Sequence, residues 1–307
     1  MGNTINVSSR ERWGEAFLHV IKEECFDVTT VAVTGARGKL GSRLVRDLIE
    51  KGCNVVAIDQ NPMDVPDCKR LQVNLSRFGE VVSALAGADA VMHMAAIPAP
   101  RGFTNEAIFA NNALSTYHVM EAASLLGIKN VVSASSESSY GYAWADRPYR
   151  HHYLPVDENH PQLPQECYGL SKVVNEATGA MFHRRNGMEV ASMRFSMIVT
   201  PDAYGQMKDR IHNPNTYKHI LWSYIDVRDA VSACIAAMER ENEEHECFNI
   251  TADDTLCAWE SKRLIETYYA GISDLRDRFE GRKALVSNEK AKRALGWRPI
   301  HSWEQYV

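Results

Sequence analysis

A tyrosine and a lysine four residues apart are the residues of this sequence best suited to proton transfer. Tyr168 and Lys172 stand at positions i and i+4 of a segment with helical spacing, which places them on one helix face. A phenol has a pKa near 10 and is a weak base at neutral pH, but a nearby ammonium group favours the phenolate. The pair could take a proton from a substrate hydroxyl while hydride leaves the same carbon. Ser136, upstream, could orient the reacting oxygen.

Three glycines nearer the start of the chain have the spacing of a dinucleotide-binding loop. The segment TGARGKLG contains Gly35, Gly38 and Gly41 between an expected strand and an expected helix. Glycines permit a tight turn and let backbone N–H groups approach a pyrophosphate at the helix start. The next expected strand ends at Asp59, whose carboxylate would bind a ribose diol and repel a 2′-phosphate. The pattern predicts NAD, although Arg37 inside the loop weakens the preference over NADP.

These residues require elements that bring them to one edge of a sheet. Apolar periodicity predicts strands at 28–36, 53–59, 70–75, 88–96, 130–136, 188–196 and 247–250. It predicts helices at 39–51, 79–85, 105–126, 168–185, 227–240, 259–269 and 288–295. This alternation predicts an α/β fold with a doubly wound (Rossmann), mostly parallel sheet of about seven strands and helices on both faces. Such sheets bind ligands beyond the carboxyl ends of their strands, where the glycine loop and Ser136 would lie.

The chain is expected to contain one main domain and a short extension. Residues 1–28 are predicted to form a helix with a capping box at Ser8 and Glu11. This helix would either pack on the main domain or bind a partner. Residues 29–307 would form the NAD-binding domain. A small substrate lobe would come mainly from 140–166, 197–223 and 250–307.

Composition argues against several other classes of protein. The net charge of -5 disfavours a nucleic-acid or anionic-membrane partner. No apolar run approaches the roughly 18 residues of a membrane span, and the first residues do not resemble a secretory signal. Seven dispersed cysteines without a C-x-x-C motif indicate free thiols and a cytoplasmic protein. His151, His152 and His160 lack carboxylate or thiol partners at ligand spacing, so no metal is expected.

Taken in order, these motifs resemble the extended short-chain dehydrogenase/reductase superfamily, in its NAD-dependent epimerase/dehydratase group. The resemblance covers about 29–300 and includes Tyr224–Asp229, similar to Y-I-x-V-x-D, and Lys290–Trp297, similar to K-A-x-x-x-L-G-W. It implies catalysis by Ser136, Tyr168 and Lys172, and a homodimer formed through the helices at 105–126 and 168–185. It also implies that NAD is bound by Gly35, Arg37, Gly38, Lys39, Leu40, Gly41, Asp59, Asn74, Leu75, Met94, Ala95, Ala96, Asn111, Tyr168 and Lys172.

The sequence departs from the sugar-nucleotide members of that group. Met197 stands where those members have a substrate-contacting asparagine, and Trp222 and Ser223 replace an Arg-Asp pair whose arginine binds a diphosphate. The interval from Arg194 to Tyr224 is also much shorter than theirs. A reduced lobe resembles the uronate and aldose dehydrogenases, which oxidise free sugars.

We therefore expect an NAD-dependent oxidoreductase that acts on a carbinol or carbonyl of a small sugar-like substrate through Ser, Tyr and Lys. The alternatives are a sugar or sugar-nucleotide epimerase or dehydratase that recycles NAD in place, and a non-catalytic dinucleotide sensor. Glu137 is a second acid/base, a group that hydrogen-bonds the substrate or a local structural acid. The expected substrate-binding residues are Ser136, Glu137, Tyr140, Ser196 and Met197, and Tyr142 and Trp144 could line the same pocket.

Overall fold

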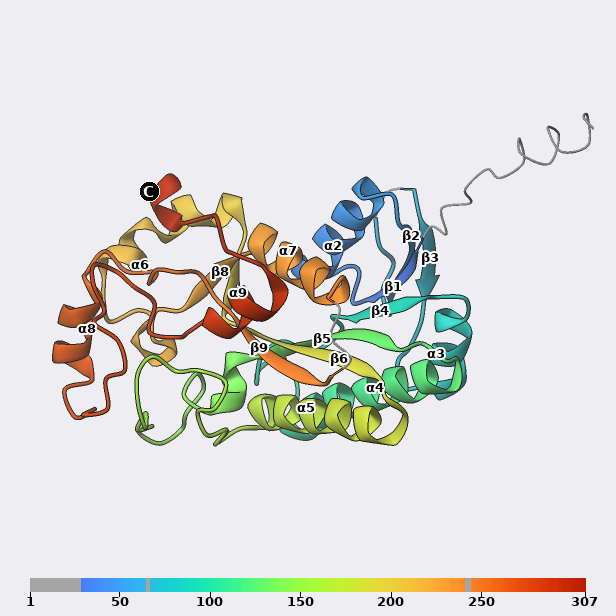
Figure 1. The fold of residues 1–307 in the computed structure, drawn as a ribbon, viewed down its shortest axis with the longest axis horizontal. Coiled ribbons are helices and arrows are strands. Elements are labelled where there is room, and N and C mark those ends of the chain that lie inside the picture. Colours follow the sequence, from blue (N-terminus) through green and yellow to red (C-terminus); the bar gives the residue numbers. More distant parts are fainter. Residues whose placement is uncertain (1–28, 65–66, 241–243) are drawn as a thin grey trace, which may run out of the picture.

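A computed structural model of the chain describes residues 29–64, 67–240 and 244–307. The helix expected within 1–28 lies outside the described residues. Figure 1 shows a central sheet with helices above and below it, and a second group of shorter elements at one end. That group contains α6 (Lys208–His212), α8 (Ser261–Tyr268) and β8 (Tyr224–Asp226). No helix among the described residues is long and apolar enough to cross a membrane.

The central sheet has seven parallel strands, as the alternation predicts. Its order is β3-β2-β1-β4-β5-β6-β9. The strands are β1 (Thr30–Thr34), β2 (Asn54–Asp59), β3 (Lys69–Gln72), β4 (Ala90–His93), β5 (Asn130–Ser136), β6 (Glu189–Phe195) and β9 (Glu246–Ile250). Helices cover both faces, and the inner strands β1, β2 and β4 are accordingly largely apolar, whereas β5 carries several serines toward its carboxyl end. The doubly wound α/β fold is therefore confirmed.

Two layers of helices cover the sheet (Figure 1). One layer contains α2 (Lys39–Glu50), α7 (Val227–Met238) and α9 (Glu289–Leu295), and the other contains α3 (Phe78–Leu85), α4 (Asn105–Leu125) and α5 (Cys167–Asn186). Alternate residues of β1 face opposite layers: Val31 and Val33 pack with the α2 layer, and Ala32 packs with the α4 layer. Leu44 and Leu48 of α2 are fully buried, which stabilises the fold by roughly 1.5–3 kcal/mol for each side chain.

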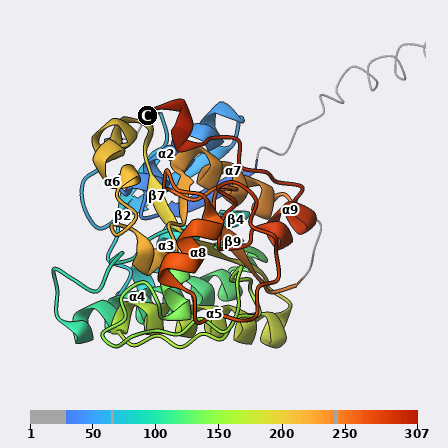
Figure 2. The ribbon, with the colours of Figure 1, turned by 90° about the vertical axis from the view of Figure 1, so that its left-hand side faces the viewer.

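The region where the substrate lobe was expected, called the lobe below, has a hydrophobic core of its own. Most of its buried side chains come from the three expected segments, among them Tyr142, Leu154, Trp222 and Leu264. A parallel pair of three-residue strands, β7 (Met197–Val199) and β8, brings together the two ends of the stretch 197–226, and the periodicity of such short strands does not predict them. Figure 2, in which the lobe faces the viewer, shows α8 in front with the light-green chain around residue 150 below it.

One part of 250–307, from α9 (Glu289–Leu295) to Trp297, lies against the main sheet, whereas Trp303 returns to the lobe core. Helix α9 packs on α7 and β9, and Trp297, just after it, belongs to the core beneath α2 and α7. The Nε1 of Trp297 donates hydrogen bonds to Ser232 Oγ (2.9 Å) and to the Asp229 carbonyl (3.2 Å). The C-terminal segment therefore spans both halves of the molecule and ties them together.

Candidate functional site

The glycine loop connects β1 to α2 at the point where the strand order reverses. Gly35 has a φ of 69°, and a Cβ atom there would lie 2.7 Å from the backbone N of Ala95. A Cβ atom on Gly41 would lie 2.2 Å from the Gly35 carbonyl oxygen. Any side chain at either position would force the loop apart. Gly38 is the N-cap of α2, so the free N–H groups of this helix begin beside the loop, where an anionic phosphate is favoured.

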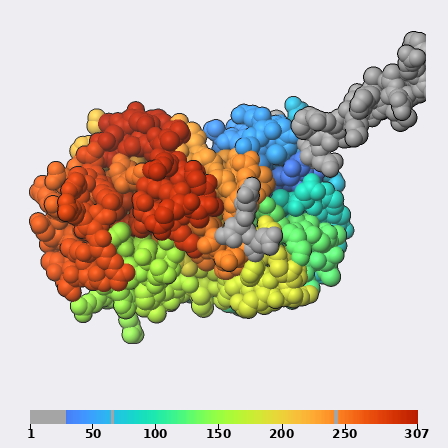
Figure 3. Space-filling model, viewed as in Figure 1, coloured from blue at the N-terminus to red at the C-terminus, as the bar shows by residue number. Residues whose placement is uncertain are grey.

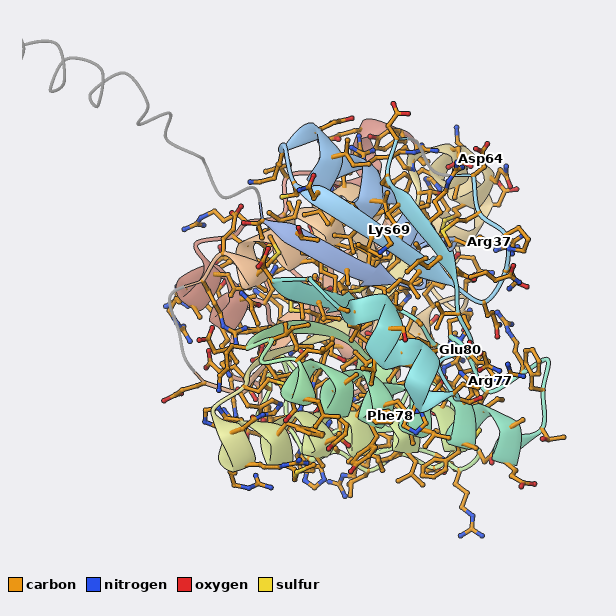
Figure 4. The ribbon with its side chains drawn as sticks, turned by 90° about the vertical axis from the view of Figure 1, so that its right-hand side faces the viewer. Arg37, Asp64, Lys69, Arg77, Phe78 and Glu80 are labelled. Carbon is orange, nitrogen blue, oxygen red and sulfur yellow. The ribbon has the colours of Figure 1, made fainter. Side chains whose placement is uncertain are left out.

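Beside this loop is a hollow of about 160 Å³ at the carboxyl ends of β1, β2, β3 and β4. Asp59 lies on its wall at the end of β2, and its carboxylate accepts hydrogen bonds from the backbone N–H groups of Arg37 (3.1 Å) and Asn61 (3.0 Å). The other lining residues include Gly35, Gly38, Asn74, Leu75, Met94, Ala95, Ala96 and Asn111. Figure 4 shows Arg37 at the outer edge of the molecule, and its side chain is exposed. Most of the expected cofactor residues are therefore brought together.

The turn that carries Asn74 is held by the start of α3. The Glu80 carboxylate accepts hydrogen bonds from the Asn74 N–H (3.0 Å) and from the Arg77 guanidinium (2.9 Å). Figure 4 shows Arg77 and Glu80 side by side at this end of α3. The Asn74 side chain accepts from Ser76 (3.0 Å from the backbone N), so it shapes the turn as well as lining the hollow.

Sequence reasoning named Asn111 but missed its neighbour. Asn111 is exposed at the rim of the hollow, whereas Asn112 is buried. The Asn112 amide accepts a hydrogen bond from the Ile97 N–H (2.8 Å) and donates to the Ile97 carbonyl (3.1 Å) and to Ser171 Oγ (3.2 Å). It thereby ties the loop after β4 to α4 and α5. The signal that could have identified Asn112 is a polar amide side chain at a position of the helix that faces the sheet.

A larger cavity of about 540 Å³ continues from the glycine loop toward the lobe. Ser136, Tyr168 and Lys172 line it together with Gly35, Gly38, Lys39, Leu40 and Gly41. Ser136 comes from the end of β5, and the other two side chains come from the first turns of α5. Lys39 Nζ reaches across the cavity mouth and donates to the Ile198 carbonyl (3.1 Å). We call this cavity the catalytic cavity, and it contains all three expected catalytic side chains.

The tyrosine and the lysine both lie in a dry environment. Burial raises the pKa of Tyr168 to about 12, although a hydrogen bond with Ser136 opposes the shift. Burial lowers the pKa of Lys172 to about 8. The Lys172 ammonium donates to the Ala134 carbonyl (2.7 Å) and lies 5.6 Å from the centre of the Tyr168 ring. Desolvation therefore dominates the pKa of Tyr168 in this structure, and the expected lowering by Lys172 is not seen.

Glu137 is the most unusual acid of the catalytic cavity. Its side chain is buried, and one carboxyl oxygen accepts hydrogen bonds from Ser223 Oγ, from Ser196 Oγ (3.1 Å) and from Tyr142 OH (3.3 Å). Burial raises its pKa to about 8, because three hydroxyl donors compensate only part of the desolvation. The sequence indicated Glu137 and Ser196 as substrate contacts, but it did not connect them through Ser223 and Tyr142.

Tyr140 does not belong to the catalytic cavity, which corrects the expectation that it binds substrate. It is fully buried, and its OH donates to Asn249 (2.7 Å) and accepts from Arg194 (2.9 Å). Arg194 also forms a buried ion pair with Glu176 (2.8 Å). The polar end of Tyr140 completes this network, so the ring turns away from the substrate side. Met197 and Ser196, by contrast, do line the cavity.

A family model gives independent evidence on the class of this chain. The model described as the NAD dependent epimerase/dehydratase family matches residues 31–251. An L-arabinose 1-dehydrogenase (NAD(P)(+)) of Haloferax volcanii is 30% identical over 200 residues, covering 62% of this chain and 76% of that protein. A UDP-glucose 4-epimerase of Corynebacterium glutamicum is 24% identical over 318 residues, covering 88% of this chain and 91% of the epimerase.

A solved structure shows the same fold. A short-chain dehydrogenase/reductase superfamily protein from Agrobacterium tumefaciens, crystallised with bound NAD, superimposes with a TM-score of 0.71. It is 24% identical, and the match covers 90% of this chain and 94% of that one.

Proposed function

This chain belongs to the NAD dependent epimerase/dehydratase family, and on that premise we propose that it is an NAD-dependent dehydrogenase that oxidises a carbinol of a small sugar-like substrate. The observation that carries the proposal is the catalytic cavity, in which Ser136, Tyr168 and Lys172 lie beside the glycine loop. The same family includes dehydrogenases and epimerases, so the choice between them depends on the substrate side of the cavity.

The glycine loop and the neighbouring hollow fit NAD. Gly35 and Gly41 leave room only for backbone, which lets a pyrophosphate approach the start of α2. Asp59 lies on the wall where an adenosine ribose would be bound, and its negative charge favours NAD over NADP. When bound, NAD supplies the acceptor for the substrate hydride.

The protein supplies the proton chemistry and the orientation. Ser136 Oγ holds the substrate oxygen in line with Tyr168, whose phenol oxygen receives the hydroxyl proton. The phenol must lose its own proton first, so the Lys172 ammonium has to act on it more strongly in the loaded enzyme than in this state. Glu137, protonated at neutral pH, can donate a hydrogen bond to a second substrate hydroxyl.

The lobe favours a substrate without a diphosphate. Trp222 occupies the position at which the sequence comparison expects an arginine in sugar-nucleotide enzymes. Its side chain is fully buried, and its Nε1 donates a hydrogen bond to the Pro214 carbonyl (2.9 Å). The adjacent Ser223 holds Glu137 rather than a phosphate. A free sugar, as in the L-arabinose dehydrogenase, suits such a neutral site better than a nucleotide sugar.

Glu137 also gives the strongest support for the second candidate, an epimerase or dehydratase. A buried carboxyl with a pKa of about 8 beside Ser136 could move a second proton at a carbon next to the one that is oxidised. In that reaction the cofactor is restored in each cycle, and no NADH accumulates.

The decisive experiment follows NADH absorbance while the protein is mixed with NAD and a panel of aldoses, uronates and UDP-sugars. We expect NADH to accumulate with a free aldose or uronate, and we expect Tyr168→Phe to abolish the reaction while NAD still binds. Tyr306→Phe is the matched control, because Tyr306 is a partly exposed tyrosine that does not line the cavity. Conversion of a UDP-sugar without NADH would support the epimerase, and full activity of Tyr168→Phe would contradict the mechanism.

We also propose that two copies pair through α4 and α5. Four large apolar side chains on these helices are exposed: Leu114, Tyr117, Leu125 and Leu170. Burial of this row against a second copy would remove apolar surface from water. Light scattering should give the mass of a dimer, and Leu170→Glu should reduce it to that of a monomer.

A further inference from the structure

A second large cavity lies in the lobe, next to the catalytic cavity. Its volume is about 720 Å³, and it is formed by the chain after Tyr142, by the residues around Lys218 and by the end of α8. Figures 1 and 2 show the light-green chain around residue 150 running beside α8, and Figure 3 shows the two surfaces meeting at the lobe end of the molecule. A hollow of about 390 Å³ shares four of its lining residues, including Tyr149 and Tyr268. We call the two together the distal cavity.

The distal cavity adjoins the catalytic cavity. Ala143, Trp144 and His219 line both. Burial lowers the pKa of His219, so all three shared side chains are uncharged at neutral pH. A ligand that occupies both cavities would therefore cross a boundary without charged side chains.

The walls of the distal cavity are mainly aromatic rings. They include Tyr142, Trp144, Tyr149, His151, Tyr268 and Tyr269. Charged side chains also line part of the distal cavity, namely Asp146, Arg147, Arg150 and Lys218. The His151 ring lies 5.0 Å from that of Tyr142, 5.1 Å from that of Tyr149 and 5.3 Å from that of Tyr269. Rings of this kind provide flat apolar surfaces with hydrogen-bonding edges, which suit the C–H face of a sugar ring.

Two polar atoms in these walls lack the partners that burial normally demands. His151 is only 4% exposed, and its Nδ1 has no hydrogen-bond partner within the described part of the chain. The Tyr149 OH is likewise buried and without a partner among the described residues. Burial lowers the pKa of His151 to about 3 and raises that of Tyr149 to about 12, so both groups are neutral at physiological pH. Buried polar atoms left in this way point to a neutral ligand that would complete them.

We propose that the distal cavity is a subsite for the second ring of a neutral disaccharide, whose first ring is oxidised in the catalytic cavity. The inference rests on the proposed function, because it extends a sugar substrate beyond the reacting ring. The second ring would stack on the aromatic walls, and its hydroxyl groups would hydrogen-bond His151 Nδ1 and Tyr149 OH. The glycosidic oxygen would lie between Trp144 and His219.

The test compares single sugars with disaccharides on the full chain with NAD. L-arabinose, D-glucose and D-galactose serve as monosaccharides, lactose, cellobiose and maltose as disaccharides, and UDP-glucose as the nucleotide probe. In Tyr149→Ala we expect KM for the preferred disaccharide to rise about tenfold, with kcat unchanged and KM for the monosaccharides unchanged. His151→Phe should have the same effect while keeping an aromatic ring. Tyr306→Ala is the control for loss of a tyrosine elsewhere, because Tyr306 lines neither cavity.

Saturation-transfer NMR supplies a readout that does not depend on turnover. In the wild-type protein, the protons of the non-reacting ring of the disaccharide should receive saturation, and Tyr149→Ala should abolish it. If those protons are saturated but no sugar reduces NAD, the proposed function fails and the subsite stands. Disaccharides that bind no better than monosaccharides, or variants that affect both equally, would overturn the inference. The inference is also overturned if Tyr149→Ala weakens the binding of UDP-glucose instead of that of the disaccharides.

Discussion

The glycine loop and the lobe both contain residues with a positive φ, but they stabilise this backbone conformation in different ways. In the loop, the positive φ of 69° falls on Gly35, a residue type that adopts it freely. In the lobe, Leu221 and Trp222 have φ of 56° and 51°, which L side chains rarely adopt. Both side chains are fully buried, and the Trp222 N–H donates to the Tyr217 carbonyl (3.0 Å). Residue type secures the first region, whereas packing secures the second.

Hydrogen bonding shows the same contrast. The cofactor side satisfies its polar groups with nearby backbone. Asp59 accepts from the N–H groups of Asn61 and of Arg37 in the glycine loop, and the Asn74 side chain accepts from the Ser76 N–H. In the lobe, the buried hydroxyl group of Tyr217 has no hydrogen-bond partner among the described residues, and neither has His151 Nδ1. The sugar ligand proposed above would supply the missing hydrogen bond of His151. The named groups of the cofactor side, by contrast, are already paired with backbone.

The largest effect is expected from Gly35→Val. The new Cβ would meet the Ala95 backbone at 2.7 Å and would also sit at a positive φ, so the loop must open. NAD binding, followed by quenching of tryptophan fluorescence, should weaken by roughly a hundredfold or more, since the loop places the pyrophosphate. Gly205→Ala in the lobe is the control, because no described atom lies within 4 Å of its added Cβ. Equal NAD binding by both variants would contradict the assignment of the glycine loop as the pyrophosphate-binding site.

A lobe variant should separate stability from cofactor binding. Trp222→Ala removes a fully buried side chain and keeps the strained backbone, so the free energy of unfolding should fall by about 3–5 kcal/mol. Urea denaturation measures this change. NAD affinity of the folded fraction should stay within about twofold, because Trp222 lies in the lobe core and not in the cofactor cradle. Loss of NAD binding in the folded protein would show that the two regions are not independent.

Lys172→Met tests how the Lys172 ammonium affects the pKa of the Tyr168 phenol. Without the ammonium the Tyr168 phenol holds its proton more tightly, so kcat/KM at pH 7 should fall by roughly a hundredfold. The rising limb of the pH profile should also move to higher pH, because a higher phenol pKa needs a lower proton concentration. Lys208→Met provides a control lysine in α6 of the lobe. A uniform drop at every pH would indicate a loss of binding rather than of proton transfer.

The smallest effect concerns the pH dependence of stability. Because burial raises the pKa of Glu137 from 4.5 to about 8, the folded protein holds this proton more tightly than the unfolded chain does. Its contribution to stability is complete below about pH 4.5 and is lost as pH rises toward 8. Glu137→Gln should therefore lose less stability over that range, by about 1–2 kcal/mol. Thermal denaturation at pH 5 and pH 8 measures it, and parallel pH curves for the two proteins would refute the assignment.

The sequence by itself determined the sheet and the glycine loop, and it located the residues that we propose as catalytic. These follow from periodicity and from residue types with local meaning: Gly35 at a turn, Asp59 at a strand end, Tyr168 and Lys172 one helical turn apart. Such features depend on neighbours in the chain, so the pattern alone is enough to place them.

Only the tertiary structure decided how the substrate side is arranged. Tyr140 turns into the Arg194 network, Ser223 reaches Glu137 from far along the chain, and the distal cavity forms where the chain around Tyr149 meets α8. None of these pairings has a local signal, because each depends on how separate segments pack. The same packing buries Tyr168 and raises its pKa, an effect that the spacing to Lys172 could not reveal.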